Sequence, residues 1–400
     1  MTPEIKQRIE QIRRGEVPEG YKKGKLGIVP EEWNETSFST LFTSTSEYTD
    51  DLDKYPLYSL TIEDGVTPKT ERYERSHLVK KEDSYKIVRP NDYAYNPMNL
   101  RFGSVARHKG NLPVAVSGYY DIFTTVHKSD LPFMDSFLTC GPMITYYNRV
   151  STGSLVEKQR VHFSQFLEFV LPLPSINERA KIATILTTQD KVIKLKEKRL
   201  AEKQRQKKYL MHRFFVDANG KKIRLGQIAN VIMGQSPSST SYNEQMEGMP
   251  LIQGNGDIEG RNTHPRMYTT QPTKICKKGD ILISVRAPVG SVSRSSMNAC
   301  IGRGMCAVDA GIYQNYVYQY LIYFEDKWGK VSQGSTFESI SGDEIRKLKT
   351  LIPDNMQHIE KILSTADREI ELLQQDIEQE KQKKKALMQL LLTGIARVKT

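Results

Sequence analysis

The sequence predicts an α+β fold in which one globular domain followed by one long helix is written twice. Three observations predict it. The segment Ile185-Leu-Thr-Thr-Gln-Asp190 recurs as Ile362-Leu-Ser-Thr-Ala-Asp367, at an offset of 177 residues. Apolar residues continue from both copies at the seven-residue spacing of a coiled-coil helix. Short strand-like runs between Gly, Pro and Ser clusters precede each helix.

The repeat extends well beyond this segment. In the helices, the offset of 177 pairs Ile193 with Ile370, Leu200 with Ile377, Lys207 with Lys384, Leu210-Met211 with Leu387-Met388 and Phe214-Phe215 with Leu391-Leu392. Upstream, the two copies align with small changes in the offset. Val150–Ser154 aligns with Val331–Ser335, Gly103–Val105 with Gly290–Val292, Asn91–Tyr95 with Gly279–Ile283, and Phe38 and Leu41 with Leu225 and Ile228. Two copies of this size exclude a solenoid of short stacked repeats.

Five segments follow from the repeat. They are an N-terminal helix with the stretch leading into the first domain (1–30), a first domain (31–174), a central helix (175–216), a second domain (217–353) and a C-terminal helix (354–400). Within the domains we expect strands at Asp92–Tyr95, Val114–Val116, Asp280–Ile283 and Cys300–Ile301. We expect one helix near Phe133–Tyr147 and another near Tyr313–Lys327.

The two long helices have predictable ends and one predictable face. Ser175-x-x-Glu178 and Asp354-x-x-Gln357 each follow a proline and have the form of capping boxes. The series Ile193, Leu200, Lys207, Phe214 and Ile370, Ile377, Lys384, Leu391 indicate a seam between the helices. That seam is imperfect, because Lys196, Lys203 and Glu380 occupy its other track.

Composition narrows the class of protein. The net charge of +11 on 400 residues favours a polyanionic partner. The N-terminus lacks the apolar core of a secretory signal and no run approaches a membrane span, so we expect a cytosolic chain. Cys140, Cys276, Cys300 and Cys306 lack metal-ligand or disulfide spacing, so we expect buried small side chains. Nucleotide, metalloprotease and hydrolase motifs are absent, and we predict no metal site and no catalytic residues.

The excess of positive charge lies in one place. Residues 191–224 contain thirteen Lys or Arg and three Asp or Glu, so this stretch has +10 of the total +11. One interpretation is a solvated basic helix that pairs with the acidic helix beginning near 354. The more specific interpretation is that Lys203 and Lys207 also lie next to the phosphate backbone of a bound nucleic acid.

Gly-rich loops in both domains contain the residue types that read base edges. The candidates are Asn96, Asn99, Arg101 and Arg107 in the first domain, and Gln235, Ser236, Gln253, Asn255, Arg286 and Arg303 in the second. Each is a weak signal alone. Their occurrence in both copies, on a basic chain without catalytic motifs, favours DNA binding.

These residues resemble the DNA specificity subunits of type I restriction-modification systems over nearly the whole chain. The resemblance rests on Pro18-Glu-Gly-Tyr21, Gly27–Trp33, Gly279–Gly290, Cys300–Gly304, Gly334-Ser-Thr-Phe337 with Ile340-Ser341, and the endings Leu210-Met211 and Leu387–Gly394. It implies two target-recognition domains separated by two long antiparallel helices in a coiled coil, with a circular pseudo-twofold arrangement. Each domain would read one half of a split, asymmetric site in double-stranded DNA.

The resemblance also implies partners. The chain would be a non-catalytic scaffold for two methyltransferase subunits, with restriction subunits joining the full complex. S-adenosylmethionine, ATP and Mg²⁺ would bind to those partners. We expect Ile193, Leu200, Leu210, Phe214, Ile370, Ile377, Leu387 and Leu391 to lie on the partner-binding helices.

Two departures and two alternatives accompany this hypothesis. Arg179 stands where the family commonly has Gln in a Pro-x-x-Glu-Gln signature, and Asn96-Pro-Met-Asn99 stands where the second domain has Ser284-Val-Arg-Ala287. Because of the second departure, we expect the two domains to read different half-sites. The alternatives are a related system whose partner fuses nuclease and methyltransferase, and a coiled-coil scaffold whose paired domains bind protein.

Overall fold

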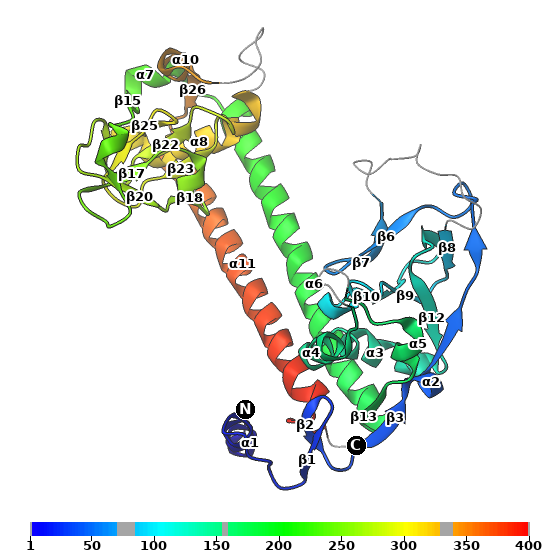
Figure 1. Cartoon of the computed structure of the whole chain (residues 1–400). Helices are drawn as coiled ribbons and strands as arrows, with labels where there is room; N and C mark the ends of the chain where they lie inside the picture. The colour runs from blue at the N-terminus through cyan, green and yellow to red at the C-terminus, as the bar shows by residue number, and fades with distance from the viewer. Residues whose placement is uncertain (1, 70–84, 154–158, 329–338, 399–400) are drawn as a thin grey trace. The chain divides into compact units, whose positions relative to one another are not determined.

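The structure is a computed structural model that describes residues 2–69, 85–153, 159–328 and 339–398 (Figure 1). Its contacts divide the chain into two compact units, Met1–Leu195 with Ile377–Thr400, and Lys196–Asp376. Each unit contains one α+β domain and part of both long helices, α6 (Ile176–His212) and α11 (Met356–Leu392). Within the described ranges, every helix is too short or too polar to cross a membrane. The repeat segments at Val331–Ser335 and Gly334–Phe337, and the end of Val150–Ser154, lie outside the described residues.

The first unit begins with α1 (Pro3–Arg13) and the hairpin of β1 (Tyr21–Gly24) and β2 (Gly27–Pro30). The predicted N-terminal helix is confirmed. The C-terminal residues pack against this segment, because the Tyr21 hydroxyl donates a hydrogen bond of 2.7 Å to the carbonyl of Gly394. Gly394 has a left-handed φ of +72°, and a Cβ there would overlap the ring of Pro30, so only glycine fits.

Two sheets form most of the first domain. Their strands are β4 (Phe42–Thr45), β5 (Tyr48–Thr49), β8 (Tyr85–Val88), β9 (Tyr93–Tyr95), β10 (Val105–Arg107), β11 (Val114–Ser117) and β12 (Asp121–Thr125). The strand orders are β10-β9-β12-β4 and β11-β8-β5, and β6 (Tyr58–Thr61) and β7 (Gly65–Pro68) form a separate hairpin. The strands predicted near residues 92–95 and 114–116 are confirmed.

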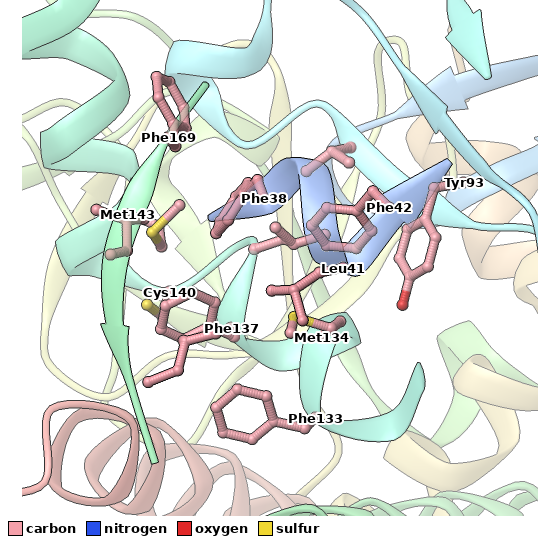
Figure 2. Close-up of a cluster of buried hydrophobic side chains, with 14 of the residues drawn as sticks. Phe38, Leu41, Phe42, Tyr93, Phe133, Met134, Phe137, Cys140, Met143 and Phe169 are labelled. Carbon is pink, nitrogen blue, oxygen red and sulfur yellow. The ribbon is translucent and has the colours of Figure 1, made fainter. Parts of the chain in front are cut away.

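Aromatic side chains fill the core of this domain. Phe123 from β12 is fully buried and stacks on Tyr93 with ring centroids 5.1 Å apart. Figure 2 shows how the neighbouring cluster gathers Phe38 and Phe42 from the start of the domain with Phe133 and Phe137 from later helices. Cys140 lies in the same cluster, and all four cysteines are free and buried, as predicted. Segments from both ends of the domain therefore share one core.

The helix predicted over 133–147 is two helices, α3 (Leu131–Phe137) and α4 (Gly141–Val150), so that prediction was wrong at its centre. Pro142 is the reason. A proline disfavours helical backbone in the residue before it and tolerates only the first turn of a helix. α4 accordingly starts next to Pro142, with extended Cys140 as its N-cap. The remaining helical elements are α2 (Phe38–Leu41), η2 (Leu100–Phe102), η3 (Lys128–Asp130) and α5 (Phe163–Leu167).

The second domain is built from a six-stranded and a five-stranded sheet. The first has the order β15-β25-β22-β23-β19-β18 and the second β16-β20-β17-β24-β21. Their strands are β15 (Asn230–Met233), β16 (Tyr242–Asn243), β17 (Met249–Ile252), β18 (Ile258–Glu259), β19 (Asn262–Thr263), β20 (Met267–Thr269), β21 (Ile275–Cys276), β22 (Ile281–Ser284), β23 (Val292–Arg294), β24 (Ala299–Ile301) and β25 (Met305–Asp309). The strands predicted at 280–283 and 300–301 are confirmed.

In the described part of the second domain the helical elements are α7 (Leu225–Ile228), η6 (Ser239–Ser241), η7 (Asn255–Asp257), η8 (Gly311–Tyr313), α8 (Gln314–Phe324), η9 (Glu325–Lys327) and α10 (Gly342–Lys347). The helix expected near Tyr313–Lys327 is confirmed as α8 with η9. It buries Val317, Tyr320 and Leu321 against the sheet that contains β22.

Each domain is joined to its long helix in the same way. In the first, β3 (Asn34–Ser37) pairs with β13 (Val170–Leu173), and α6 follows β13. In the second, β14 (Lys221–Arg224) pairs with β26 (Lys349–Ile352), and α11 follows β26. The four-residue helices after β3 and β14, α2 and α7 (Leu225–Ile228), begin and end at the residues that the repeat pairs.

The predicted capping boxes form only in part. The Ser175 hydroxyl accepts the Glu178 N–H at 3.2 Å, but the Glu178 carboxylate is buried and accepts from Arg397 at 2.8 and 3.0 Å instead of turning back to Ser175. The second box was wrong, because α11 begins at Met356 and Asp354 lies outside its N-cap position. In the first box, the ion pair with Arg397 thus replaces the hydrogen bond that the Glu178 carboxylate would accept from the Ser175 backbone N–H.

Lysines and acids link α6 with α11 inside each unit. In the second unit Lys196 pairs with Asp376 at 2.8 Å, and Lys203 pairs with Glu369 at 2.7 Å. Lys207 then pairs with Asp367. Partner numbers fall as lysine numbers rise, so the two segments run antiparallel within this unit. The lysines that interrupt the predicted apolar seam are therefore neutralised by the facing helix.

One of these pairs is repeated in the first unit. There Lys384 of α11 pairs with Asp190 of α6 at 2.6 Å. The offset of 177 relates Lys384 to Lys207 and Asp190 to Asp367, so the same lysine and the same aspartate pair in both units with the helices exchanged. In the second unit Asp367 also accepts a hydrogen bond from Gln319 of α8, which ties the domain to both helices.

The Lys207–Asp367 pair should couple more strongly than the Lys203–Glu369 pair. The side chain of Lys207 is 11% exposed and that of Lys203 is 34% exposed, so water screens the first pair less. A double-mutant cycle with Lys207→Ala and Asp367→Ala, read by urea unfolding, should give a coupling free energy of about 1 kcal/mol. The same cycle at Lys203 and Glu369 is the control and should give less. Equal couplings would contradict this account.

Candidate nucleic-acid interface

Four loops of the second domain meet at one edge of its sheets. They follow β15, β17, β22 and β24, and backbone hydrogen bonds join each to another. The N–H groups of Gly234 and Gln235 donate to Met305 and Ile301, each at 2.9 Å, and that of Gly302 donates to Ile252 at 2.8 Å. Val285 donates to Gly304 at 2.9 Å. We name this cluster (234–237, 253–257, 285–290 and 302–304) the four-loop edge.

All six residues predicted as DNA-binding in the second domain lie on the four-loop edge. They are Gln235, Ser236, Gln253, Asn255, Arg286 and Arg303. Gln235, Gln253, Arg286 and Arg303 are exposed, and Ser236 and Asn255 are half-buried. The structure therefore brings together residues that the sequence spreads over almost 70 positions.

The loop after β17 is held by a buried carboxylate. Asp257 accepts the N–H of Gln253 at 2.8 Å and the Arg266 Nε–H at 3.0 Å. Both of its oxygens are thus occupied, so this carboxylate presents little unbalanced negative charge to a polyanion. The Gln253 side chain is free to point outward while its backbone is fixed.

In the first domain the predicted residues are used differently. Asn96 is buried, and its side-chain oxygen accepts the N–H groups of Met98 and Asn99 at 3.1 and 3.3 Å, so it shapes the turn. Asn99 is exposed. The Arg101 guanidinium lies over the ring of Phe102 and donates to Gln159 at 3.3 Å. Asn99 and Arg101 remain candidates for base contact.

The Arg107 side chain makes its hydrogen bonds within the chain. Its Nε and Nη2 donate to Asp135 of α3 at 3.0 and 2.8 Å, and its Nη1 donates to Asn91 at 2.6 Å. Burial raises the pKa of Asp135, but Arg107 and the nearby Lys109 outweigh that effect and hold the pKa below its usual value. This geometry indicates that Arg107 fixes β10 to α3. Its assignment to DNA stays a prediction.

The long helices divide their cations into two groups. Lys203 and Lys207, predicted to border phosphates, face Glu369 and Asp367 of α11. For these two lysines, the structure therefore agrees with the first interpretation, in which the basic helix pairs with the acidic one. A second group, Lys191, Lys194, Lys198 and Arg205, is exposed on α6.

The eight apolar residues predicted on the partner-binding helices are all turned inward. Ile193, Ile377 and Leu391 are buried, and Leu200, Leu210, Phe214, Ile370 and Leu387 are half-buried. The most exposed apolar residues of α6 and α11 are instead Leu195 (67%), Tyr209 (62%), Ile176 (60%) and Leu372 (53%). Their exposure could have been predicted from the sequence, because these residues lie outside the seven-residue series that forms the seam.

Another surface that sequence reasoning missed is a groove of about 1200 Å³ in the second unit, between α6, α8 and α11. Lys208, Arg261, Arg294 and Tyr318 line part of it. Arg261 donates to Glu325 at 2.7 and 2.8 Å, so its charge is largely balanced. Within the described ranges, no group of three or more His, Cys, Asp or Glu side chains is arranged to bind a metal.

Comparisons with known proteins agree on one family. Residues 219–382 match the family model of the type I restriction modification DNA specificity domain. The chain is 28% identical over 422 residues to the putative type I restriction enzyme MjaX specificity subunit of Methanocaldococcus jannaschii, covering 96% of this chain and 98% of that protein.

Solved structures share the fold. A chain from a study of complex assembly and conformational transition of the type I R-M system has a TM-score of 0.63 at 20% identity, covering 92% of this chain and 99% of its own. The S subunit of a type I restriction-modification system from M. genitalium has a TM-score of 0.52 at 16% identity, covering 92% and 97%.

The Asp135 ion pair predicts a pH dependence of stability. A carboxylate whose pKa is lower in the folded than in the unfolded state stabilises the fold above its unfolded pKa of about 3.8, and loses this contribution as the pH falls through the folded pKa. Asp135→Asn should therefore cost about 2 kcal/mol in urea unfolding at pH 7. That deficit should shrink below pH 3.8.

The control is Asp343→Asn, because Asp343 is 75% exposed and pairs with Arg346 one helical turn away. It should change the unfolding free energy by less than about 0.5 kcal/mol at either pH. A deficit in Asp135→Asn that is the same at pH 7 and below pH 3.8 would contradict an ionised Asp135.

Proposed function

The chain belongs to the type I restriction-modification DNA specificity family, and from this premise we propose that it reads a split, asymmetric sequence in double-stranded DNA. Each domain reads one half-site. The chain itself carries out no reaction. It holds two methyltransferase subunits, and through them restriction subunits, and these partners bind S-adenosylmethionine, ATP and Mg²⁺.

The four-loop edge is the single observation that supports DNA reading most strongly. Base readout needs exposed Arg, Gln, Asn and Ser side chains on a surface that does not rearrange when the DNA leaves. Gln253 and Arg303 fit this need, because their side chains are exposed while the backbone around them is hydrogen-bonded to neighbouring loops. The exposed cations of α6 would then add contacts with phosphate that are independent of sequence.

The repeated helix pair supports a bipartite site. Each long helix has 37 residues, which corresponds to about 55 Å at 1.5 Å per residue. One turn of DNA is about 34 Å long, so a rigid pair of this length suits two half-sites on one duplex. The crossed Lys207–Asp367 and Lys384–Asp190 pairs support a pseudo-twofold coiled coil with an equivalent junction near each domain.

Exposed apolar side chains on the helices support docking of the methyltransferase subunits. Leu195, Tyr209 and Leu372 are each more than half exposed, and covering their apolar surface by docking would stabilise a complex. We assign the contact with the partner subunits to these residues rather than to the seam residues, which are already covered within the chain.

Competition binding tests the proposed function. The chain in complex with its methyltransferase subunit should prefer a duplex containing its site over a scrambled duplex by about 10³-fold or more. Both affinities should fall as salt rises from 50 to 200 mM, because phosphate contacts release counterions. Equal affinity for all duplexes at both salt concentrations would reject DNA reading.

A matched deletion tests the helices as the spacer. Removing residues 197–203 from α6 and 369–375 from α11 takes out one heptad from each and leaves the Lys196–Asp376 and Lys207–Asp367 pairs in place. The helices shorten by about 10 Å, which corresponds to about three base pairs. The recognised half-sites should stay the same while the spacer between them shortens. An unchanged spacer would reject the helices as its determinant.

A further inference from the structure

Arg303 lies on the most tightly held turn of the four-loop edge. The turn joins β24 to β25 and is closed by a hydrogen bond of 3.0 Å from the Met305 N–H to the Gly302 carbonyl. Gly302 and Gly304 are buried on either side of Arg303, whereas Arg303 is exposed. Its own N–H donates to the Ser236 hydroxyl at 3.2 Å. The backbone is therefore fixed directly beneath an outward-pointing arginine.

The flanking glycines allow the turn to pack onto the loop after β17. A Cβ on Gly302 would lie 3.2 Å from the Cα of Gln253, and a Cβ on Gly304 would overlap the carbonyl oxygen of Gln253. Any larger residue would push the turn away from Gln253. This close approach holds the Arg303 turn against the loops that contain Ser236 and Gln253, and the Val285 N–H donates to Gly304 from a third loop.

The guanidinium of Arg303 is available to a ligand. Arg261, Arg266, Arg294 and Arg346 of the same domain each donate to a side-chain oxygen of Glu325, Asp257, Asn315 or Asp343. Across the described part of the chain, the Arg303 side chain has neither an ion pair nor a hydrogen bond. Binding a new acceptor therefore breaks no existing contact of this arginine.

We propose that Arg303 determines specificity for a guanine base in the half-site read by the second domain. This inference rests on the proposed function. A guanidinium donates two parallel hydrogen bonds to O6 and N7 of guanine in the major groove, an acceptor pair that no other base pair presents there. The Arg303 turn packs against the loops of Ser236 and Gln253, whose side chains are also of the types that read base edges, and this setting favours a base edge over a phosphate.

The test is selection of bound sites from a duplex library with randomised half-sites, using the full chain in complex with its methyltransferase subunit. The wild-type complex should select a G·C pair at one or more positions of one half-site. Arg303→Ala should reduce the preference at one of these positions by about 5- to 150-fold and leave the other half-site unchanged. Arg303→Lys, which keeps the charge but loses the fork, should lose the same preference.

Lys278→Ala is the matched control. Lys278 is an exposed cation that precedes β22, whereas the loop 285–290 follows it, so it lies at the opposite end of that strand from the four-loop edge. Its removal should leave every base preference as in the wild type.

The outcomes separate the two claims. A wild-type complex that selects no sequence would reject DNA reading itself. A wild-type complex with a sequence that Arg303→Ala leaves unchanged would overturn only the guanine assignment. A variant that weakens binding to all duplexes uniformly, with a smaller salt dependence, would assign Arg303 to a phosphate and would also overturn it.

Discussion

The lysine–aspartate pairs between α6 and α11 are the contacts on which the packing of the two helices within each unit depends. A partly buried ion pair adds little net stability, but a mismatched register would leave a lysine facing apolar side chains without its partner. Lys207 meets Asp367 in one unit, and their repeat counterparts Lys384 and Asp190 meet in the other. One pair of side chains, duplicated with the helix, thus determines the register at two places.

The two domains share the strand pair that leads into the long helix but present different surfaces. Both are closed by a strand pair before their long helix, β3 with β13 and β14 with β26. At the loop after β9, however, the Asn96 side chain accepts hydrogen bonds within the turn, whereas the corresponding loop after β22 presents the exposed Arg286. Different loop chemistry at equivalent positions is consistent with two different half-sites.

The repeat made the fold predictable, because an insertion in a loop changes the offset between copies but not the pairing of elements. It predicted both long helices and the strands β9 and β22, and it paired Phe38 and Leu41 with Leu225 and Ile228, the residues that bound α2 and α7. The four-loop edge was predictable residue by residue but not as a cluster, since loops far apart in sequence meet only through the sheet order.

Long-range pairing decides the contacts of several charged side chains in ways that the sequence does not indicate. Glu178 has the spacing of a capping box, but Arg397, more than 200 residues away, takes its carboxylate. Arg107 is of a residue type that reads base edges, but its guanidinium donates to Asp135, which lies on a helix distant in the sequence. Lys203 and Lys207 counted as excess charge, but they face acids of α11. A single sequence contains no signal that shows which acidic side chain will face a given lysine or arginine in the fold.

Mapping of methylated bases in a host that expresses this chain with its methyltransferase subunit tests the central claim most directly. A chain that reads DNA with two domains held apart by helices should direct methylation to one asymmetric motif, made of two short half-sites with a spacer of fixed length. Methylation at a contiguous motif, or at the same sites when this chain is left out, would contradict the account.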